Sequence, residues 1–387
     1  MKRILLPAAG AVLSTGLLAA GLTGTAQADR DIAHDRMARD TSEAVSVASF
    51  WLASNGAALR QATQYTWDAK EVRKVVSKGG YSPDGRPGTT APTGESKPSS
   101  TAQNVNLPKT VGKVFFVDGS GGFRWCSATS IQSNYRNLVA TAGHCVYDTD
   151  SDRALLDNWV FVPGYYQGKT PWGIYVGKQA FTHYDFDTYE DYDRDYAFVT
   201  VYNGIHLDGV KQVDRKEYQR FTGPKRAWGG HYHILLSKDA GRLGDNVGGQ
   251  GFAWNQPAGK AVRAFGYPAA PHPDGDKPYT GVTPKTCYGT PTAKAVGAPW
   301  LKIQEHLSLK CAVTPGYDGA PWLRDYSNGK RLGYVNGVTS TFTDQDANDR
   351  IDHITSPYFD SETAAVYNAA KNVWSGKIVG PNGELYK

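Results

Sequence analysis

Short apolar runs separated by turn-forming residues dominate the chain from about residue 111 onward. These runs are rich in Val, Phe and Tyr, and the clearest cover residues 114–117, 138–140, 160–162, 197–201, 264–266 and 334–338. Short strands at fairly regular intervals, with turns between them, predict a β-sandwich or β-barrels. The 43 glycines and 21 prolines also favour many turns over long helices.

Helical patterns are confined to the two ends of the chain. Asp40, with Glu43 three residues later, forms a capping-box pattern ahead of a largely apolar stretch. A second stretch, residues 67–76, places three valines on one helix face. Residues 361–373 predict a closing helix with Ser361 as its N-cap.

The first 28 residues have the three parts of a secretory signal peptide. Two basic residues follow the initial Met, residues 4–22 are mostly apolar, and residues 26–28 form an A-x-A cleavage site. A membrane anchor is the weaker alternative, because Pro7 and several Gly, Ser and Thr residues interrupt the apolar run. No later stretch approaches the ~20 apolar residues of a spanning helix. We therefore expect cleavage near Ala28 and export of the mature protein.

Composition divides the rest of the chain into three parts. Residues 29–77 are helix-like and lack cysteine, whereas residues 78–110 are rich in Pro, Gly, Ser and Thr. The composition of residues 78–110 cannot bury a hydrophobic core and therefore predicts a linker. Residues 111–387 carry the strand pattern and form the main domain. The first part is then a helical pro-segment or arm, although a disordered tail is an alternative that the sequence leaves open.

Charge and cysteine content limit the function classes. The formal net charge of +5 falls to about +3 without the predicted signal peptide, which gives no case for binding nucleic acid or a membrane surface. All four cysteines lie beyond residue 120 of a chain predicted to be exported, so two disulfides are expected, with three possible connectivities. Proximity favours Cys126–Cys145 and Cys287–Cys311, each worth about 3 kcal/mol in the chain-entropy model.

One segment points to a specific chemistry. Residues 141–145 read Thr-Ala-Gly-His-Cys, which resembles the histidine motif of chymotrypsin-like serine peptidases. The resemblance implies that His144 occupies the general-base position. Asp195, directly ahead of the apolar run 197–201, resembles the family's Asp-hydrophobic-Ala motif and fits the carboxylate that orients the imidazole. Most of the other acidic residues between 185 and 193 we expect to form a solvated loop.

The nucleophile loop departs from the family pattern. These peptidases carry their serine in a Gly-x-Ser-Gly-Gly-Pro loop, and the segment of that shape here, residues 316–322, reads Gly-Tyr-Asp-Gly-Ala-Pro-Trp. Asp318 thus stands at the serine position, and Gly316, Asp318 and Gly319 form the oxyanion loop. Tyr317 and Ala320 are further departures from the family motif.

The resemblance extends over roughly residues 111–375. Cys311 precedes Asp318 by seven residues, as in a group of secreted actinobacterial trypsin-like peptidases. Further stretches similar to that group are residues 158–165, 247–251, 265–268 and 356–359. The family implies an all-β fold of two six-stranded antiparallel β-barrels, here with a C-terminal helix and a helical N-terminal arm. It also implies the disulfides Cys126–Cys145 and Cys287–Cys311.

Aspartate at position 318 is expected to prevent peptide hydrolysis. A carboxylate attacking a peptide would form a high-energy anhydride, and its charge would hold His144 as imidazolium, which is no general base. It would also repel the oxyanion at the Gly316 and Asp318 amides. By analogy with removal of a triad serine, a loss of about a millionfold is expected. The sequence therefore predicts a monomeric pseudo-peptidase that binds a peptide or protein in the former cleft, without a cofactor.

Two alternative functions remain open at this level. An active serine endopeptidase would need a substitute hydroxyl, such as that of Thr314 or Ser340. A purely structural or cell-surface module would need only the fold.

No metal site is predicted. His231 and His233 lack a third ligand and fit a surface loop. The acidic residues between 344 and 352, and the Asp191-x-Asp193-x-Asp195 run, lack the glycine of a calcium loop.

Overall fold

A computed structural model describes residues 31–66, 75–76, 83–95, 107–149, 154–293 and 296–380. The predicted signal peptide, most of the second predicted helix and part of the predicted linker lie outside the described residues. None of the described helices is long and apolar enough to cross a membrane.

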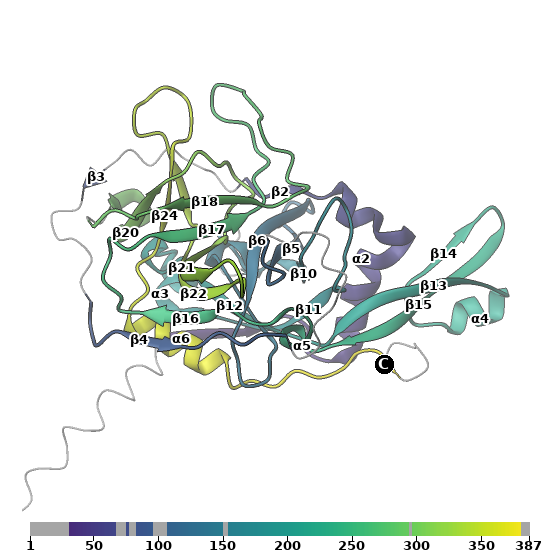
Figure 1. The fold of residues 1–387 in the computed structure, drawn as a ribbon. Coiled ribbons are helices and arrows are strands. Elements are labelled where there is room, and N and C mark those ends of the chain that lie inside the picture. The colour runs from purple at the N-terminus through teal and green to yellow at the C-terminus, as the bar shows by residue number, and fades with distance from the viewer. Residues whose placement is uncertain are drawn as a thin grey trace, which may run out of the picture.

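Six antiparallel strands close into a barrel in the first half of the chain (Figure 1). They follow one another around the barrel as β5-β6-β7-β12-β11-β10, and the pairing of β10 with β5 closes the ring. Their bounds are β5 (Val111–Val117), β6 (Phe123–Ile131), β7 (Leu138–Thr141), β10 (Asp157–Pro163), β11 (Tyr175–His183) and β12 (Ala197–Val201). Successive side chains of a β-strand point to opposite faces, so neighbouring residues of β5 belong to different hydrophobic clusters. Val114 belongs to the same cluster as Val139, and Phe115 to the same cluster as Trp125.

The second half, together with β3 and β4 of the N-terminal segment, forms two further sheets that make up a half-barrel. One sheet has the order β18-β17-β21-β22-β16-β4, and the other has the order β23-β24-β20-β19-β3. The bounds are β3 (Val75–Val76), β4 (Gly88–Thr90), β16 (Gly251–Trp254), β17 (Val262–Gly266), β18 (Lys285–Gly289), β19 (Val296–Ala298), β20 (Ile303–Lys310), β21 (Pro321–Ser327), β22 (Leu332–Val338), β23 (Thr341–Thr343) and β24 (His353–Ser356). The predicted chymotrypsin-like double-barrel fold is confirmed.

Two of the described helices are longer than two turns, and both flank the barrels. Helix α2 (Thr41–Gln61) begins after Asp40, whose Oδ1 accepts a hydrogen bond from the Glu43 amide at 2.9 Å, so the predicted N-cap is confirmed. Helix α6 (Ser361–Ala370) has Asp360 as its N-cap, so the Ser361 cap was wrong by one residue. Shorter helical turns are α3 (Tyr184–Tyr189), α4 (Arg215–Arg220), α5 (Leu243–Val247), η1 (Gly143–Cys145), η2 (Tyr192–Arg194) and η3 (Pro299–Leu301).

The N-terminal segment pairs with strands of both halves. Strand β1 (Ile32–Arg36) runs antiparallel to β11, and β2 (Thr63–Gln64) runs parallel to β6. Strand β4, within the stretch whose composition predicts a linker, pairs with β16. The described end of the second predicted helix is strand β3, paired with β19, because Val75 and Val76 find a partner strand there.

A three-stranded sheet extends away from the barrels (Figure 1). It consists of β13 (Gly204–Val213), β14 (Lys225–Trp228) and β15 (His231–Gly241), with α4 between β13 and β14. His231 and His233 therefore belong to a strand and not to the surface loop expected for them. The remaining pair of strands is β8 (Tyr147–Asp148) and β9 (Ala154–Leu155).

Candidate active site

His144 and Asp195 meet because two neighbouring strands of the first barrel end together. Strands β7 and β12 are antiparallel, with Thr141 opposite Ala197. The turn η1, which carries His144, follows β7, and Asp195 directly follows η2, ahead of β12. Both residues therefore emerge at the same end of the pair.

The imidazole of His144 is held by three hydrogen bonds around Asp195. Its Nδ1 lies 2.8 Å from Asp195 Oδ2, and its backbone amide donates to Asp195 Oδ1 at 2.9 Å. Ser340 donates its hydroxyl to Asp195 Oδ2 at 2.5 Å. His144 and Asp195 are fully buried. The Asp195 carboxylate thereby fixes the orientation of the ring and leaves Nε2 directed to the other side.

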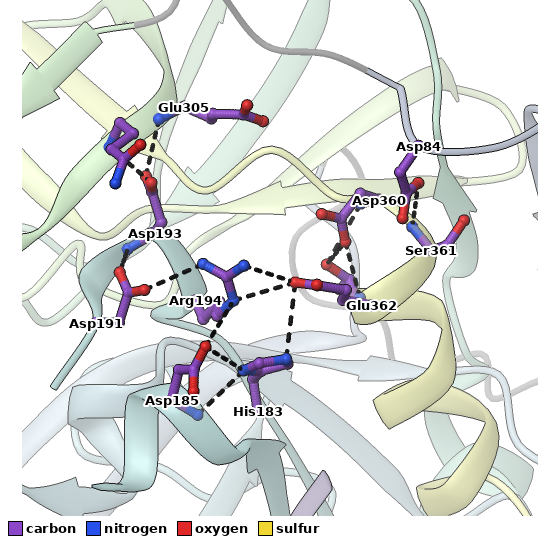
Figure 2. A network of polar contacts seen from close by, with 12 residues as sticks. Asp84, His183, Asp185, Asp191, Asp193, Arg194, Glu305, Asp360, Ser361 and Glu362 are labelled. Carbon is purple, nitrogen blue, oxygen red and sulfur yellow. Dashed lines mark hydrogen bonds and ion pairs between the residues drawn. The ribbon is translucent and has the colours of Figure 1, made fainter. Parts of the chain in front are cut away.

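An ion-pair network fixes the turn that carries Asp195 (Figure 2). Arg194 pairs with Glu362 of α6 at 2.8 Å and with Asp191 at 3.1 Å, which ties η2 to the C-terminal helix. Asp193 accepts the amides of Gln304 and Glu305 at 2.6 and 2.9 Å, which ties η2 to β20. Asp191 and Asp193 are thus bonded and do not belong to the solvated part of the acidic loop.

A second part of this network reaches the N-terminal segment. His183 lies between Asp185 and Glu362, at 3.8 and 3.7 Å. Burial, together with the charge of Arg194, lowers the pKa of His183 to about 4, so this imidazole is neutral at pH 7. Asp84 accepts the amide of Ser361 at the start of α6 (Figure 2).

The loop that carries Asp318 is built on two glycines in the left-handed region. Gly316 has a φ of 98° and Gly319 a φ of 73°. A Cβ on Gly316 would come within 2.6 Å of Tyr267 O, and one on Gly319 within 2.3 Å of Ser127 O. Ser127 of β6 then anchors the loop: its amide donates to Asp318 O at 2.8 Å, and its hydroxyl donates to Gly316 O at 2.7 Å.

The carboxylate of Asp318 bridges the imidazole and the oxyanion loop. Oδ1 lies 3.4 Å from Nε2 of His144, while Oδ2 accepts the amide of Gly316 at 2.7 Å. Asp318 is 3% exposed. His144, Asp195 and Asp318 therefore converge as the sequence motifs predict, and the amide that would bind an oxyanion is occupied by the protein's own side chain.

Electrostatics hold His144 in its charged form. Burial alone would lower the pKa of His144, but the carboxylates of Asp195 and Asp318 outweigh it and raise the pKa to about 10. Burial alone would raise the pKa of Asp195, but the charge of His144 and three hydrogen bonds lower it. The centre at pH 7 is an imidazolium between two carboxylate side chains.

Two aromatic rings at the site carry no sequence signal that we recognised. Tyr65, directly after β2, stacks on the imidazole of His144 with the centroids 6.3 Å apart and the planes at 26°. Tyr192 of η2 lies 6.4 Å away at 33°. Tyr65 is placed by its amide, which donates to Trp125 O at 2.9 Å. The N-terminal segment thus contributes a ring that stacks on the imidazole of His144.

Both disulfides join the cysteines that lie nearest in sequence, Cys126 with Cys145 and Cys287 with Cys311. The first ties β6 to the turn that carries His144. Cys126, Cys145 and His144 are close enough to resemble a metal site. The two sulfur atoms are bonded to each other, however, and supply no thiolate ligand.

Solved structures of proteases resemble this chain. A protease named Anisep from Arthrobacter nicotinovorans is 25% identical, with a TM-score of 0.50 over 69% of this chain and 98% of its own. A thermostable serine protease named AL20, from an extremophilic microorganism, is 24% identical, with a TM-score of 0.50 over 70% of this chain and 100% of its own. No protein-family model and no curated protein sequence matches the chain. The protein therefore has the chymotrypsin-like double-barrel fold, and the solved structures that it resembles are serine proteases of this fold.

Proposed function

We propose that this protein is a homologue of the trypsin-like serine peptidases that binds a peptide or protein in its former active-site cleft without hydrolysing it. The observation that carries the proposal is the position of the Asp318 carboxylate. It lies between Nε2 of His144 and the amide of Gly316, where the nucleophilic hydroxyl and the oxyanion would have to be.

Three physical effects then oppose peptide hydrolysis. The amide of Gly316 already binds an anionic oxygen, so an incoming carbonyl cannot use it. His144 is charged at pH 7 and cannot accept a proton. Attack by the carboxylate itself would give an anhydride, which is less stable than the peptide.

A serine endopeptidase with a substitute nucleophile is the second candidate, and no observation favours it. The hydroxyl of Ser340 donates to Asp195 Oδ2, which places it on the Nδ1 side of the imidazole. Thr314 is fully buried at the start of the loop. Neither hydroxyl occupies the place of Asp318 beside Nε2.

The proposal includes an extracellular location. The first 28 residues support export, and two disulfides fit an oxidising compartment. Residues 29–77 then form a pro-segment or arm of the exported chain, and residues 78–110 link it to the main domain. The pairing of β1, β2 and β4 with the barrels supports a role in covering or bracing the main domain.

Fluorophosphonate labelling tests the missing nucleophile. The mature wild-type protein should neither label nor cleave casein or chromogenic peptides, because position 318 carries no hydroxyl. The Asp318→Ser variant should regain labelling, since His144, Asp195 and both glycines of the loop are in place, although Tyr317 and Ala320 can limit the recovery. Cleavage of casein by wild type, abolished in a His144→Ala variant, would show a working nucleophile and overturn the proposal.

Photo-crosslinking tests the binding role. Peptides from a casein digest that carry a photoreactive group should crosslink near residues 314–320 in wild type and in Asp318→Ser alike. Crosslinks confined to other surfaces, or none at all, would leave the protein without the proposed cleft ligand and favour a structural role.

A further inference from the structure

Asp318 has the surroundings of a carboxylate nucleophile. Oδ2 is held by the Gly316 amide at 2.7 Å, while Oδ1 lies 3.4 Å from Nε2 of His144. Attack of a carboxylate on a saturated carbon gives an ester, which is far more stable than an anhydride and is still open to hydrolysis. The oxygen that becomes the ester carbonyl is the one already bound to the oxyanion-loop amide. The geometry that opposes peptide hydrolysis therefore suits displacement at a saturated carbon.

We propose that the protein hydrolyses small terminal epoxides to vicinal diols, with Asp318 as the nucleophile and His144 as the acid and then the base. This activity goes beyond peptide binding in the cleft and does not depend on it.

An epoxide fits this site better than an alkyl halide does. When an epoxide opens, its oxygen must receive a proton, whereas a halide leaves as a stable anion. His144 is buried between two carboxylates, which raise its pKa to about 10, so its resting form carries the proton that is needed. Its Nε2 lies 3.4 Å from Oδ1 of Asp318. The acid and the nucleophile are therefore adjacent before the substrate arrives.

The first step opens the ring. Oδ1 of Asp318 forms a bond to the less substituted epoxide carbon, and the bond between that carbon and the epoxide oxygen breaks. The oxygen takes the proton from Nε2 of His144. The products are a neutral hydroxyalkyl ester of Asp318 and a neutral imidazole, with Oδ2 still at the Gly316 amide.

The second step returns the carboxylate. The ester carries no charge, so His144 keeps only Asp195 as an anionic neighbour and can accept a proton from water. The hydroxide attacks Cγ of Asp318, and the Gly316 amide stabilises the oxyanion on Oδ2. Collapse expels the diol alkoxide, which takes the proton back from His144. The carboxylic acid then gives its own proton to His144, and one epoxide plus one water has become one diol.

The buried position of the Asp318 carboxylate limits a substrate that reacts with it to a small molecule. Asp318 is 3% exposed, and Tyr65 and Tyr192 flank the imidazole. Trp125 lies against Gly316, so a Cβ at Gly316 would come within 2.7 Å of its ring. These rings place apolar surface beside the imidazole and the Gly316 turn, which suits a small apolar epoxide better than a charged one.

Isotope labelling of the mature wild-type protein is the decisive experiment. The probe is 1,2-epoxypropane, supplied in less than one equivalent in water enriched in ¹⁸O. We expect propane-1,2-diol without ¹⁸O and one ¹⁸O in the peptide that contains Asp318, because water attacks Cγ and not the epoxide. Diol that carries the ¹⁸O, or no diol above the buffer rate, would overturn the proposal. This experiment uses only the wild-type protein. Its outcome is independent of the photo-crosslinking experiment, so failure of the epoxide proposal can be distinguished from failure of the peptide-binding proposal.

Three variants test the assigned roles. Asp318→Asn should lose both the diol and the label. His144→Gln removes the acid of the first step and the base of the second, so it should slow both ester formation and diol release by about 100-fold or more. Asp325→Asn removes a carboxylate of which 65% is exposed and should leave the label at Asp318 unchanged. Labelling of Asp325 at the same rate as Asp318 would show ordinary alkylation of surface carboxylates and would also overturn the proposal.

Discussion

At the scale of single residues, the side chain at position 318 affects two neighbours at once. It occupies the amide of Gly316, and its charge adds to that of Asp195 on the imidazole of His144. The two effects are separable by substitution. Asparagine keeps an oxygen for the Gly316 amide and removes the charge, whereas serine removes both.

Replacing Asp318 by Asn should therefore lower the pKa of His144 by about one to three units. Nitrogen-detected NMR titration of the imidazole should find wild-type His144 charged through neutral pH, with a midpoint near pH 10. Asp325→Asn is the matched control and should leave the midpoint in place. Equal midpoints in wild type and Asp318→Asn would show that the carboxylate at 318 does not act on the ring.

The same shift makes stability depend on pH. The pKa of His144 is raised in the folded state from an ordinary value of 6.5 to about 10. Its contribution is therefore fully present below pH 6.5 and is lost as the pH rises toward 10. Denaturant unfolding should show a loss of order a few kcal/mol over this window that a His144→Gln variant lacks. Parallel curves for the two proteins would contradict the assigned shift.

At the scale of elements, helix α2 is part of the core of the first barrel. Trp51 is fully buried, and its ring lies 5.8 Å from that of Phe115 and 5.9 Å from that of Phe123. Its Nε1 donates a hydrogen bond to the carbonyl of Asn158 in β10. The N-terminal helix and two strands of the barrel thus share one set of buried rings.

Trp51→Ala should cost about 3–5 kcal/mol of unfolding free energy, the range for deleting a large buried aromatic side chain. Trp228→Ala provides the control, because Trp228 is 74% exposed at the end of β14, and it should stay within about 0.5 kcal/mol of wild type. Chemical denaturation of both variants measures the difference. A similarly small loss of unfolding free energy in both variants would mean that α2 contributes little to the stability of the first barrel.

Sequence reasoning found the elements and residues whose signals are local. The six apolar runs became strands, and His144, Asp195 and Asp318 sit in recognisable motifs next to them. It missed contacts whose cause is a distant partner. Tyr65 lies far from His144 in sequence, and strand β4 owes its pairing to β16, so neither shows a pattern of its own. The contact of Oδ2 with the Gly316 amide depends on a side-chain rotamer, which no motif specifies.

At the scale of the whole molecule, the N-terminal segment joins the two halves. It pairs with the first barrel through β1 and β2 and with the second half through β4. Asp84 adds a hydrogen bond to the start of α6. A segment joined at so many points resists removal more strongly than a flexible tail does.

Cleavage within residues 96–106, at an engineered protease site, should therefore leave the two fragments associated. We expect them to elute together in size-exclusion chromatography under native conditions and to separate in denaturant. An intact protein that carries the same site without protease treatment is the control. Spontaneous release of the N-terminal fragment would instead identify it as a removable pro-segment.

The pairing of β1 with β11 also determines when, during biosynthesis, the first strand can find its partner. Ile32 pairs with His183, which is made roughly 150 residues later, or about 8–30 seconds at ~5–20 residues per second. Strand pairing over such distances along the chain is slow even after synthesis. Strand β1 must therefore wait, unpaired, until nearly half of the chain has been made. An unpaired chain can be threaded through a narrow channel, which suits the export predicted from the first 28 residues.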